Sequence, residues 1–365
     1  MINLKEGNKN MNYKILSSFY FSGVLIIVYG CIYAGVVIGD SVYLQDIDSG
    51  TTSPTGDYRW LDVANQSYSS SYCSSYNYTQ AQVQVMFNDQ DETFRGTLSA
   101  VNLKPNFAYQ IKLVGYPGTD ANEYIGLVGR WWQEEWDGSA WANGHNLNNK
   151  GNGSSPNPND IIYFMRKNVS DQTSPTGLKY RFTGYMVFEY VIMDEYGNAT
   201  IVFEANSSYH VLWKISQRLH ADNDGPLRSV SFDVNASLPA YDIDYLEQTV
   251  NVFGEWERLP VCDIFLEYGS YVCRLLLTEE SFHGDGGANA GNWAAAMAAN
   301  VSFELLPDWD ITMDGTCNYQ DVTQMSLEWQ STGSNGWIRE DITNDGYVNY
   351  LDITQISLHW LESWP

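Results

Sequence analysis

Two twelve-residue segments near the C-terminus carry oxygen-bearing side chains at the same positions. Residues 310–321 and residues 341–352 agree at positions 1, 2, 3, 5, 6, 9, 10 and 12. A hard cation such as Ca²⁺ takes oxygen ligands from successive positions of a loop of this length, with glycine at the sixth position and a carboxylate at the twelfth. Gly315 and Gly346 occupy the sixth positions, and aspartate closes each segment. The sequence therefore predicts two loops that each bind one Ca²⁺ ion.

The predicted ligands follow from their positions in each loop. They are Asp310, Thr312, Asp314, the carbonyl of Thr316, Asn318 and Asp321 in the first loop, and Asp341, Thr343, Asp345, the carbonyl of Tyr347, Asn349 and Asp352 in the second. Side chains at positions 3 and 9 are expected to bind through a hydroxyl, an amide or a water molecule. Aspartate at position 12 has a shorter side chain than the glutamate of an EF-hand. It could therefore bind the ion through one carboxylate oxygen or through both.

A predicted amphipathic helix follows each loop, over residues 322–329 and 353–360. Apolar side chains recur there at i, i+3, i+5 and i+7, which predicts a broad buried face made of Val322, Met325, Leu327, Trp329, Ile353, Ile356, Leu358 and Trp360. No helix is expected to enter the first loop, because Pro307 stands three residues before it. The last 60 residues carry ten acidic residues and one basic residue, Arg339, an imbalance that bound cations would offset.

Two loops, each followed by a helix, resemble the type I dockerin family over about residues 306–365. The resemblance implies that calcium folds this small α-helical module, residues 307–365, and that its duplicated helices bind a cohesin module on a partner protein. It also implies that loop positions 10 and 11 contact the partner, which here are Tyr319, Gln320, Tyr350 and Leu351. These differ from the Ser-Thr pairs common in cellulosomal dockerins, so the resemblance does not identify the cohesin.

The chain begins with a basic flank followed by an uncharged apolar stretch. Lys5, Lys9 and Lys14 precede residues 15–38, which contain no charged side chain. This pattern is typical of a secretory signal peptide, and the stretch is also long enough to span a bilayer as a retained anchor. We expect residues 1–39 to be one of these two, which would place the rest of the chain outside the cell or at its surface. Membrane contact is expected only through this segment.

The composition argues against nucleic acid as a partner. The chain has 44 acidic and 19 basic residues, a formal net charge of −25. Nucleic-acid affinity depends on a basic surface that neutralises phosphates, and this charge balance does not supply one. Aromatic residues make up 15% of the chain and charged residues only 17%. Such a balance is typical of extracellular proteins rich in β-strands.

The middle of the chain shows alternating apolar and polar side chains broken by turn residues. Strands are predicted at residues 83–87, 93–101, 107–113, 182–193, 200–204, 209–214, 230–234, 249–256 and 300–305. Strands 182–193 and 200–204 are expected to form a hairpin across residues 194–198. The spacing favours one or two antiparallel, immunoglobulin-like β-sandwiches. The expected regions are residues 40–160 and a second β-sandwich region over residues 161–306, with an uncertain boundary.

Cys262 and Cys273 flank a predicted hairpin between two apolar runs, residues 261–266 and 271–277. Cross-strand pairing would bring the two side chains within disulfide range, and an oxidising exterior permits the bond. Two unpaired buried thiols are the alternative. No Cys-x-x-Cys pair occurs, so a thiolate metal site is not expected.

A Trp-rich segment precedes a stretch of Asn, Gly, Ser and Pro, and residues 131–158 are expected to form an inserted loop. Its rings are Trp131, Trp132, Trp136 and Trp141. They could stack on a polysaccharide, or they could cap one end of the sandwich. Glu134, Glu135 and Asp137 are the nearby carboxylates that a glycoside hydrolase would need, although the sequence contains no catalytic signature.

These observations favour one function and leave a second open. The first is an exported calcium-binding protein that docks through its C-terminal module onto a cohesin-bearing partner and displays β-sandwich modules. The second is a carbohydrate-active enzyme, an O-glycosyl hydrolase of polysaccharides, tethered by the same module.

Overall fold

The computed structural model describes residues 40–47, 58–64, 66–147, 158–205, 209–212, 228–234, 240–242, 245–256, 266–280, 293–333, 338–343 and 345–363. The segment expected to be a signal peptide or anchor, residues 1–39, lies outside them. Within the described part of the chain, no helix combines the length and the apolar character that a bilayer crossing requires.

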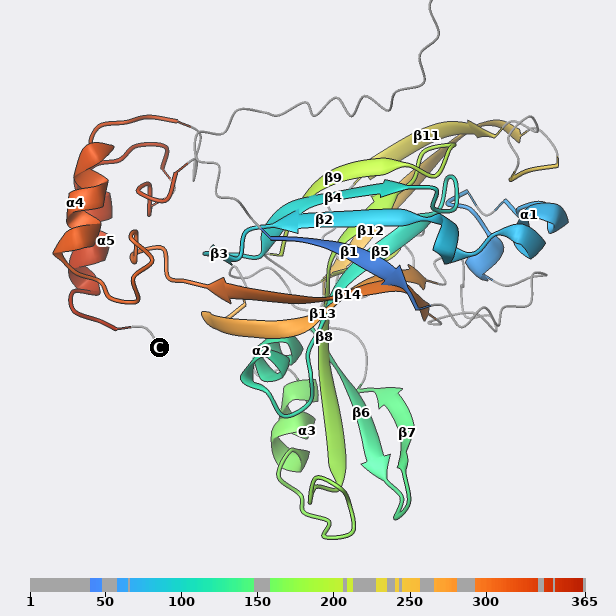
Figure 1. Ribbon diagram of the computed structural model, residues 1–365, viewed down its shortest axis with the longest axis horizontal. Helices are drawn as coiled ribbons and strands as arrows, with labels where there is room; N and C mark the ends of the chain where they lie inside the picture. The colour runs from blue at the N-terminus through green and yellow to red at the C-terminus, as the bar shows by residue number, and fades with distance from the viewer. Residues whose placement is uncertain are drawn as a thin grey trace, which may run out of the picture. The chain divides into compact units, whose positions relative to one another are not determined.

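Strands dominate the described residues (Figure 1). They are β1 (Asp40–Asp46), β2 (Gln82–Phe87), β3 (Gln90–Asp91), β4 (Arg95–Val101), β5 (Ala108–Val114), β6 (Arg130–Trp136), β7 (Trp141–Asn146), β8 (Tyr180–Ile192), β9 (Ala199–Glu204), β10 (Tyr209–Leu212), β11 (Arg228–Val234), β12 (Tyr245–Trp256), β13 (Gly269–Glu280) and β14 (Trp293–Leu305). The α-helices are α1 (Ser70–Ser75), α2 (Asp120–Val128), α3 (Pro158–Arg166), α4 (Tyr319–Leu327) and α5 (Tyr350–Leu358). The predicted class, mostly antiparallel β followed by a small helical module, is confirmed.

One large sheet runs in the order β7-β6-β8-β5-β13-β14-β1-β2-β4-β9, and β10, β12 and β11 form a smaller sheet. The pairings along the large sheet are antiparallel, and the short strand β3 joins β14 in parallel. Strand β1 pairs with β14 through Gln45 and Asp46 and with β2 through residues 40–44. It therefore links the two halves of the strand order.

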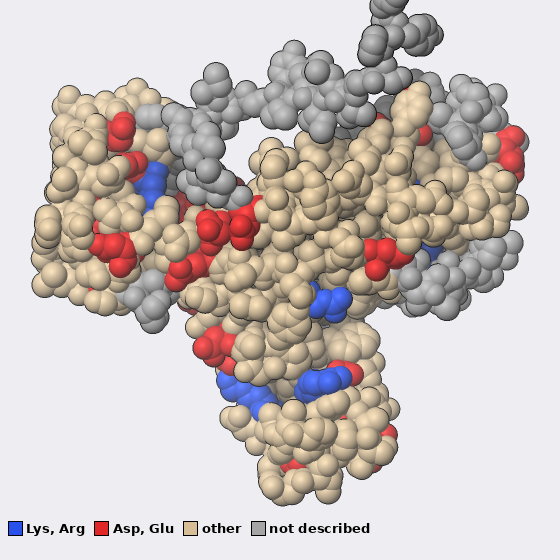
Figure 2. Space-filling model, in the orientation of Figure 1, with Lys and Arg blue, Asp and Glu red and all other residues tan. Residues whose placement is uncertain are grey.

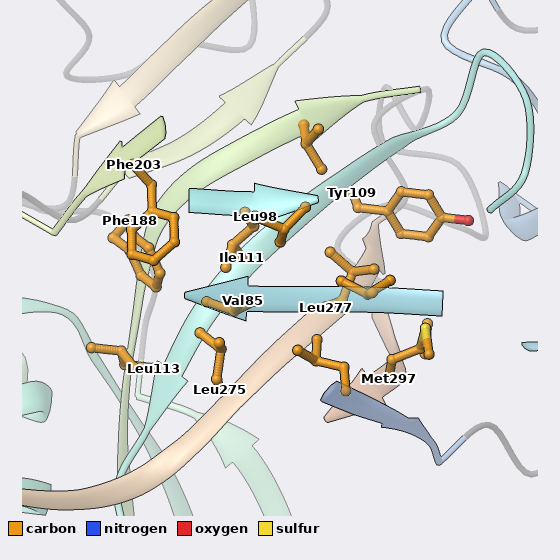
Figure 3. Packing of buried hydrophobic residues seen from close by; sticks show 14 of the residues in the cluster. Val85, Leu98, Tyr109, Ile111, Leu113, Phe188, Phe203, Leu275, Leu277 and Met297 are labelled. Atoms are coloured by element: carbon orange, nitrogen blue, oxygen red, sulfur yellow. The ribbon is translucent and has the colours of Figure 1, made fainter. Parts of the chain in front are cut away.

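The two halves share one hydrophobic core. Buried side chains of β2, β4 and β9 belong to the same cluster as those of β5, β8, β13 and β14 (Figure 3). Phe94 has ring-centre distances of 4.3 Å to Phe303 on β14 and 5.4 Å to Phe203 on β9. One ring thus contacts both halves, and each fully buried Phe contributes roughly 1.5–3 kcal/mol to folding. The packing is that of the predicted antiparallel sandwich.

Strand pairings cross the expected boundary at residue 160. Strands β8, β13 and β14 lie beyond that boundary, yet β8 pairs with β5 and β6, and β14 pairs with β1. Hydrogen-bonded strands from both predicted regions therefore build one sheet, because their alternation specifies strands but not partners. The expected loop over residues 131–158 contains the antiparallel pair β6–β7 as well.

The predicted hairpin across residues 194–198 forms its turn but not its ladder. Asp194 and Asn198 are joined by a backbone hydrogen bond of 2.9 Å, and Gly197 has a positive φ of 78°. A Cβ atom on Gly197 would collide with the carbonyl oxygen of Leu103, so glycine is required there. After the turn the strands part, since β8 pairs with β5 and β6 while β9 pairs with β4.

The predicted disulfide does not form, because Cys273 is a free thiol in the core. Cys262 lies outside the described residues. Cys273 stands opposite Val301 of β14, and from Arg274 onward β13 also pairs with β5. Cys273 therefore pairs in register with β14, and both edges of β13 are occupied by other strands from Arg274 to Glu279. Burial raises the pKa of the Cys273 thiol to about 12.

The C-terminal module has a small core of its own, made of Trp309, Ile311, Cys317, Met325, Ile342, Val348 and Ile356. Both helices begin three residues earlier than predicted, at Tyr319 and Tyr350. Asn318 and Asn349 are the N-caps, and each helix has a capping box that satisfies backbone N–H groups otherwise left without partners.

Candidate metal centre

The first carboxylate of the first loop is held by the backbone of the same loop. Asp310 Oδ1 accepts the N–H of Asp314 at 3.2 Å, and Asp310 Oδ2 accepts the N–H of Gly315 at 2.9 Å. Gly315 reaches this position with φ of 83°, a conformation that favours glycine. The sharp turn predicted at position 6 is therefore present, and it directs two N–H groups at Asp310.

The last carboxylate of the loop closes it from the other side. Asp321 Oδ1 accepts the N–H and the hydroxyl of Thr312, both at 2.9 Å, and Asp321 Oδ2 accepts the N–H of Asn318 at 2.7 Å. The Asn318 amide donates to the carbonyl of Thr316 at 2.9 Å. Asp321 also stands at the third position of α4, so one side chain caps the helix and closes the loop.

The second loop repeats these contacts position by position. Asp341 accepts the N–H groups of Asp345 and Gly346 at 3.1 and 3.0 Å, and Asp352 accepts both Thr343 groups at 2.9 Å. The Asn349 N–H donates to Asp352 at 2.8 Å, and its amide donates to the Tyr347 carbonyl at 3.1 Å. Gly346 has the same φ of 83° as its counterpart. The sequence repeat is thus a structural repeat.

Buried negative charge is concentrated in these loops. Asp310, Asp321 and Asp352 are each fully buried, and Asp341 is 2% exposed. Burial is the main cause that raises the pKa of Asp310, and the charge of Asp321 raises it further against the N–H of Gly315. Carboxylates are seldom buried without a cation, because desolvation of the charge is costly.

In the described part of the module, the buried carboxylates of the first loop form no direct ion pair with a basic side chain, although the nearby charge of Arg339 lowers the pKa of Asp310. Arg339, the one basic residue of the module, donates to the backbone carbonyls of Pro307 and Asp310 instead. Among the described residues, Asp310, Asp321 and Asp352 form no ion pair with Lys or Arg. The donors are all oxygens, so the chemistry of the set fits a hard divalent cation such as Ca²⁺.

The full predicted ligand sets are not gathered into one cluster. In the described part of the chain, no group of three or more His, Cys, Asp or Glu side chains takes an arrangement that could hold a metal ion. In the first loop, Asp314 Oδ2 instead accepts the Gln320 amide at 2.6 Å. Leu351 occupies the equivalent position of the second loop and has no such donor. The two loops therefore differ in what holds their fifth-position carboxylate.

The residues predicted to contact a partner lie at the surface of the module. Tyr319 is 71% exposed, Tyr350 69% and Leu351 40%, and Gln320 is also exposed. Acidic side chains are visible on this module in Figure 2. The four predicted positions are thus available to another molecule.

Two residues expected in the buried helix faces are exposed instead. Leu327 is 71% exposed and Leu358 is 67% exposed, whereas Met325 and Ile356 are fully buried. The expectation is wrong because positions two apart on a helix point about 200° away from each other. Trp329 and Trp360, at 43% and 46%, are also partly exposed. A strict period of 3.6 residues would have predicted that Leu327 and Leu358 are exposed.

The Trp side chains of the Trp-rich segment lie in different environments. Trp131 is fully buried and stacks on Tyr163 with a ring-centre distance of 3.8 Å, and its Nε1 donates to Asp160 at 3.2 Å. Gly126 on α2 leaves room for its ring. Trp136 and Trp141 meet edge to face at 5.5 Å where β6 and β7 join. Of the two interpretations, the packing supports Trp131 as a core side chain.

The three candidate acids near this cluster already have structural partners. Glu134 binds Arg181 at 2.7 Å, and Glu135 binds Lys179 at 3.0 Å. Asp137 accepts the N–H groups of Ser139 and Ala140 in the β6–β7 turn, which lowers its pKa. Glu134 pairs in register with Arg181 of β8, and β6 has a register shift against β7 at this point. The ion pairs of both glutamates argue against their use as the two carboxylates of a glycoside hydrolase.

Comparison of the chain with protein-family models, with curated proteins and with solved structures finds no match. The resemblance of residues 306–365 to type I dockerins therefore depends on the loop and helix pattern itself.

Proposed function

We propose that residues 307–365 form a calcium-dependent docking module that attaches the β-sandwich region to a cohesin-like protein at the cell exterior. The observation that carries this proposal is the repeated network of buried aspartates. Two loops with the same hydrogen bonds, the same left-handed glycine and buried carboxylates are difficult to explain by structure alone, since burying carboxylates destabilises a fold unless a cation compensates.

The calcium ligands would be those predicted from the loop positions. Asp310, Asp314 and Asp321 would supply the charge in the first loop, and Asp341, Asp345 and Asp352 in the second. Bound Ca²⁺ would neutralise these groups and hold both loop ends against the helix that follows. Metal binding and folding of this module would then be coupled.

The docking surface would be the exposed apolar side of the two helices. Tyr319 and Leu327 lie eight residues apart on α4, and Tyr350 and Leu358 repeat that spacing on α5. Residues at this spacing are rotated by about 80° around the helix axis, within the width of one broad helix face. Clusters of exposed apolar side chains commonly mark protein-binding surfaces. The partner would offer an apolar face with basic residues around it, because this module is strongly acidic.

The test uses the full chain and a panel of purified type I cohesin modules. Binding is measured by interferometry in Ca²⁺ and again after chelation. Calcium-dependent binding to any member, lost when Leu327 and Leu358 are both changed to Asp, supports the proposal. Failure of every cohesin to bind a chain that does bind Ca²⁺ would overturn the cohesin assignment and leave the calcium assignment standing.

A further inference from the structure

A buried cluster of reactive side chains lies in the β-sandwich region and takes no part in the proposed docking function. Glu279 on β13 is fully buried, and Lys104, in the turn before β5, is 1% exposed. Lys104 Nζ donates to Glu279 Oε1, and Arg59 Nε donates to Glu279 Oε2. An amine and a carboxyl group are thus in direct contact inside the protein.

The amine of Lys104 is enclosed by aromatic rings and a backbone carbonyl. Its Nζ lies 4.1 Å from the ring centre of Trp60 and 5.0 Å from that of Phe107, and it also donates to the carbonyl of Arg59 at 2.6 Å. Removing an ion pair from water is costly, and the reaction requires one proton to pass from the ammonium to the carboxylate. The products of the transfer are a neutral amine and a neutral acid, the two forms that condense to an amide.

The carboxyl group is held as an acceptor for attack. The Tyr78 hydroxyl donates to Glu279 Oε1, the oxygen that Lys104 also contacts, and lies 3.1 Å from the Tyr109 hydroxyl. Arg59 holds the other oxygen. As an amine adds to Cδ, negative charge grows on Oε2, and a fixed guanidinium at that oxygen stabilises it.

We propose that Lys104 and Glu279 condense to an intramolecular amide bond. The bond from Nζ to Cδ forms, the bond from Cδ to Oε1 breaks, and Oε1 leaves as water. Both protons of that water come from the Lys104 ammonium group, and Tyr78 relays the second of them to the departing oxygen. The ammonium and carboxylate therefore balance to one amide and one water without any co-reactant. Arg59 keeps its hydrogen bond to the amide oxygen.

The folded chain supplies the driving force that this reaction lacks in water. Groups held in reacting positions reach effective molarities of about 10⁵–10⁸ M. Formation of the neutral amide removes the charges of Lys104 and Glu279, and the buried guanidinium of Arg59 remains hydrogen-bonded to the amide oxygen. Exclusion of water protects the new bond from hydrolysis. The bond would join residues 175 positions apart in the sequence. It would fix the turn before β5 to β13, the strand on which Glu279 pairs with Tyr109, and would restrict the unfolded chain as a disulfide does.

The test is peptide mapping of the purified full chain by tandem mass spectrometry after denaturation and proteolysis. The expected result is one branched peptide in which the Lys104 and Glu279 segments are joined with the loss of one water. In addition, reductive methylation of the denatured chain should modify the other lysines and leave Lys104 unmodified. Recovery of both segments as separate linear peptides, with a methylated Lys104, would overturn the proposal.

A matched variant controls for branched peptides that arise during sample preparation or measurement and not in the folded protein. Lys104→Arg keeps the positive charge but has no amine that can form this bond, so it should yield only linear peptides. It should also unfold at a lower temperature than the parent chain. A branched peptide at Glu279 in Lys104→Arg would contradict the assignment of Lys104, and the parent-chain measurement decides the proposal even if this variant does not fold.

Discussion

Asp321 accepts both the backbone N–H and the hydroxyl of Thr312, each at 2.9 Å, and thereby ties the last residue of the first loop to the third. Asp352 holds Thr343 in the same way and at the same distances. Because each aspartate is also part of a helix cap, loop closure and helix initiation depend on one side chain. This is the contact through which a bound cation would stabilise the whole module.

Asp62 gives the β-sandwich region a stability that depends on pH. Burial is the largest cause that raises its pKa from 3.8 to about 6, and its hydrogen bonds from Gln66, Tyr241 and Ala64 oppose the shift. The folded state therefore binds this proton more tightly than the unfolded chain. The resulting stability is complete below pH 3.8 and is lost as pH rises through about 6.

Changing Asp62→Asn should therefore stabilise the chain at pH 8, by at most about 3 kcal/mol, and much less at pH 4. The amide oxygen can still accept the N–H groups of Ala64 and Gln66, which now bind Oδ1 at 2.9 and 2.8 Å. Denaturant unfolding of both proteins at the two pH values measures the difference. A variant that is less stable than the parent at pH 8 would contradict the assignment.

Removal of the Trp131 ring should destabilise the region around α3. Trp131→Ala deletes a fully buried ring stacked on Tyr163, and such changes cost about 3–5 kcal/mol. Trp136→Ala is the matched control, because Trp136 is only half-buried at the end of β6 and should cost about 1 kcal/mol. Denaturant midpoints with near-unchanged slopes give both values. Equal losses in the two variants would show that Trp131 is not a core residue.

Local patterns in the sequence predicted the two repeated loops and many strands, because the information that specifies them is local. Asp310 and Asp321 belong to one twelve-residue segment. Alternation along residues 83–87 identifies β2 without reference to the strands that pair with it. Strand pairing is a different matter, since it depends on segments far apart. Nothing near Met193 or Thr200 indicates that β8 and β9 separate after their shared turn.

The cluster around Glu279 shows the same limit for a site. Its partners come from three separate segments of the chain and are Arg59, Tyr78 and Lys104. No local sequence motif therefore predicts this cluster. The exposed position of Leu327 is a different case, because a strict period of 3.6 residues would have separated it from Met325. Prediction of the Glu279 cluster needs the tertiary structure, whereas the exposure of Leu327 follows from helix geometry alone.

The exposed apolar side of the helices should be dispensable for folding. Leu327 and Leu358 are 71% and 67% exposed, so Leu327→Asp with Leu358→Asp should change the free energy of unfolding by less than about 1 kcal/mol in Ca²⁺. Far-UV circular dichroism and thermal unfolding measure this. The matched pair Met325→Asp with Ile356→Asp places charge in the core and should unfold the module. Similar losses in both pairs would show that Leu327 and Leu358 are structural.

Calorimetric titration of the purified full chain with CaCl₂ tests whether the two loops bind calcium. We expect two ions bound per chain, one ion in Asp321→Asn or Asp352→Asn, and two again in the control Glu328→Gln, which lies beyond the end of α4. Each Asn variant removes a buried carboxylate that accepts three hydrogen bonds, so its loop loses both a ligand and its closure. A parent chain that takes up no Ca²⁺, or Asn variants that bind as many ions as the parent, would contradict the account.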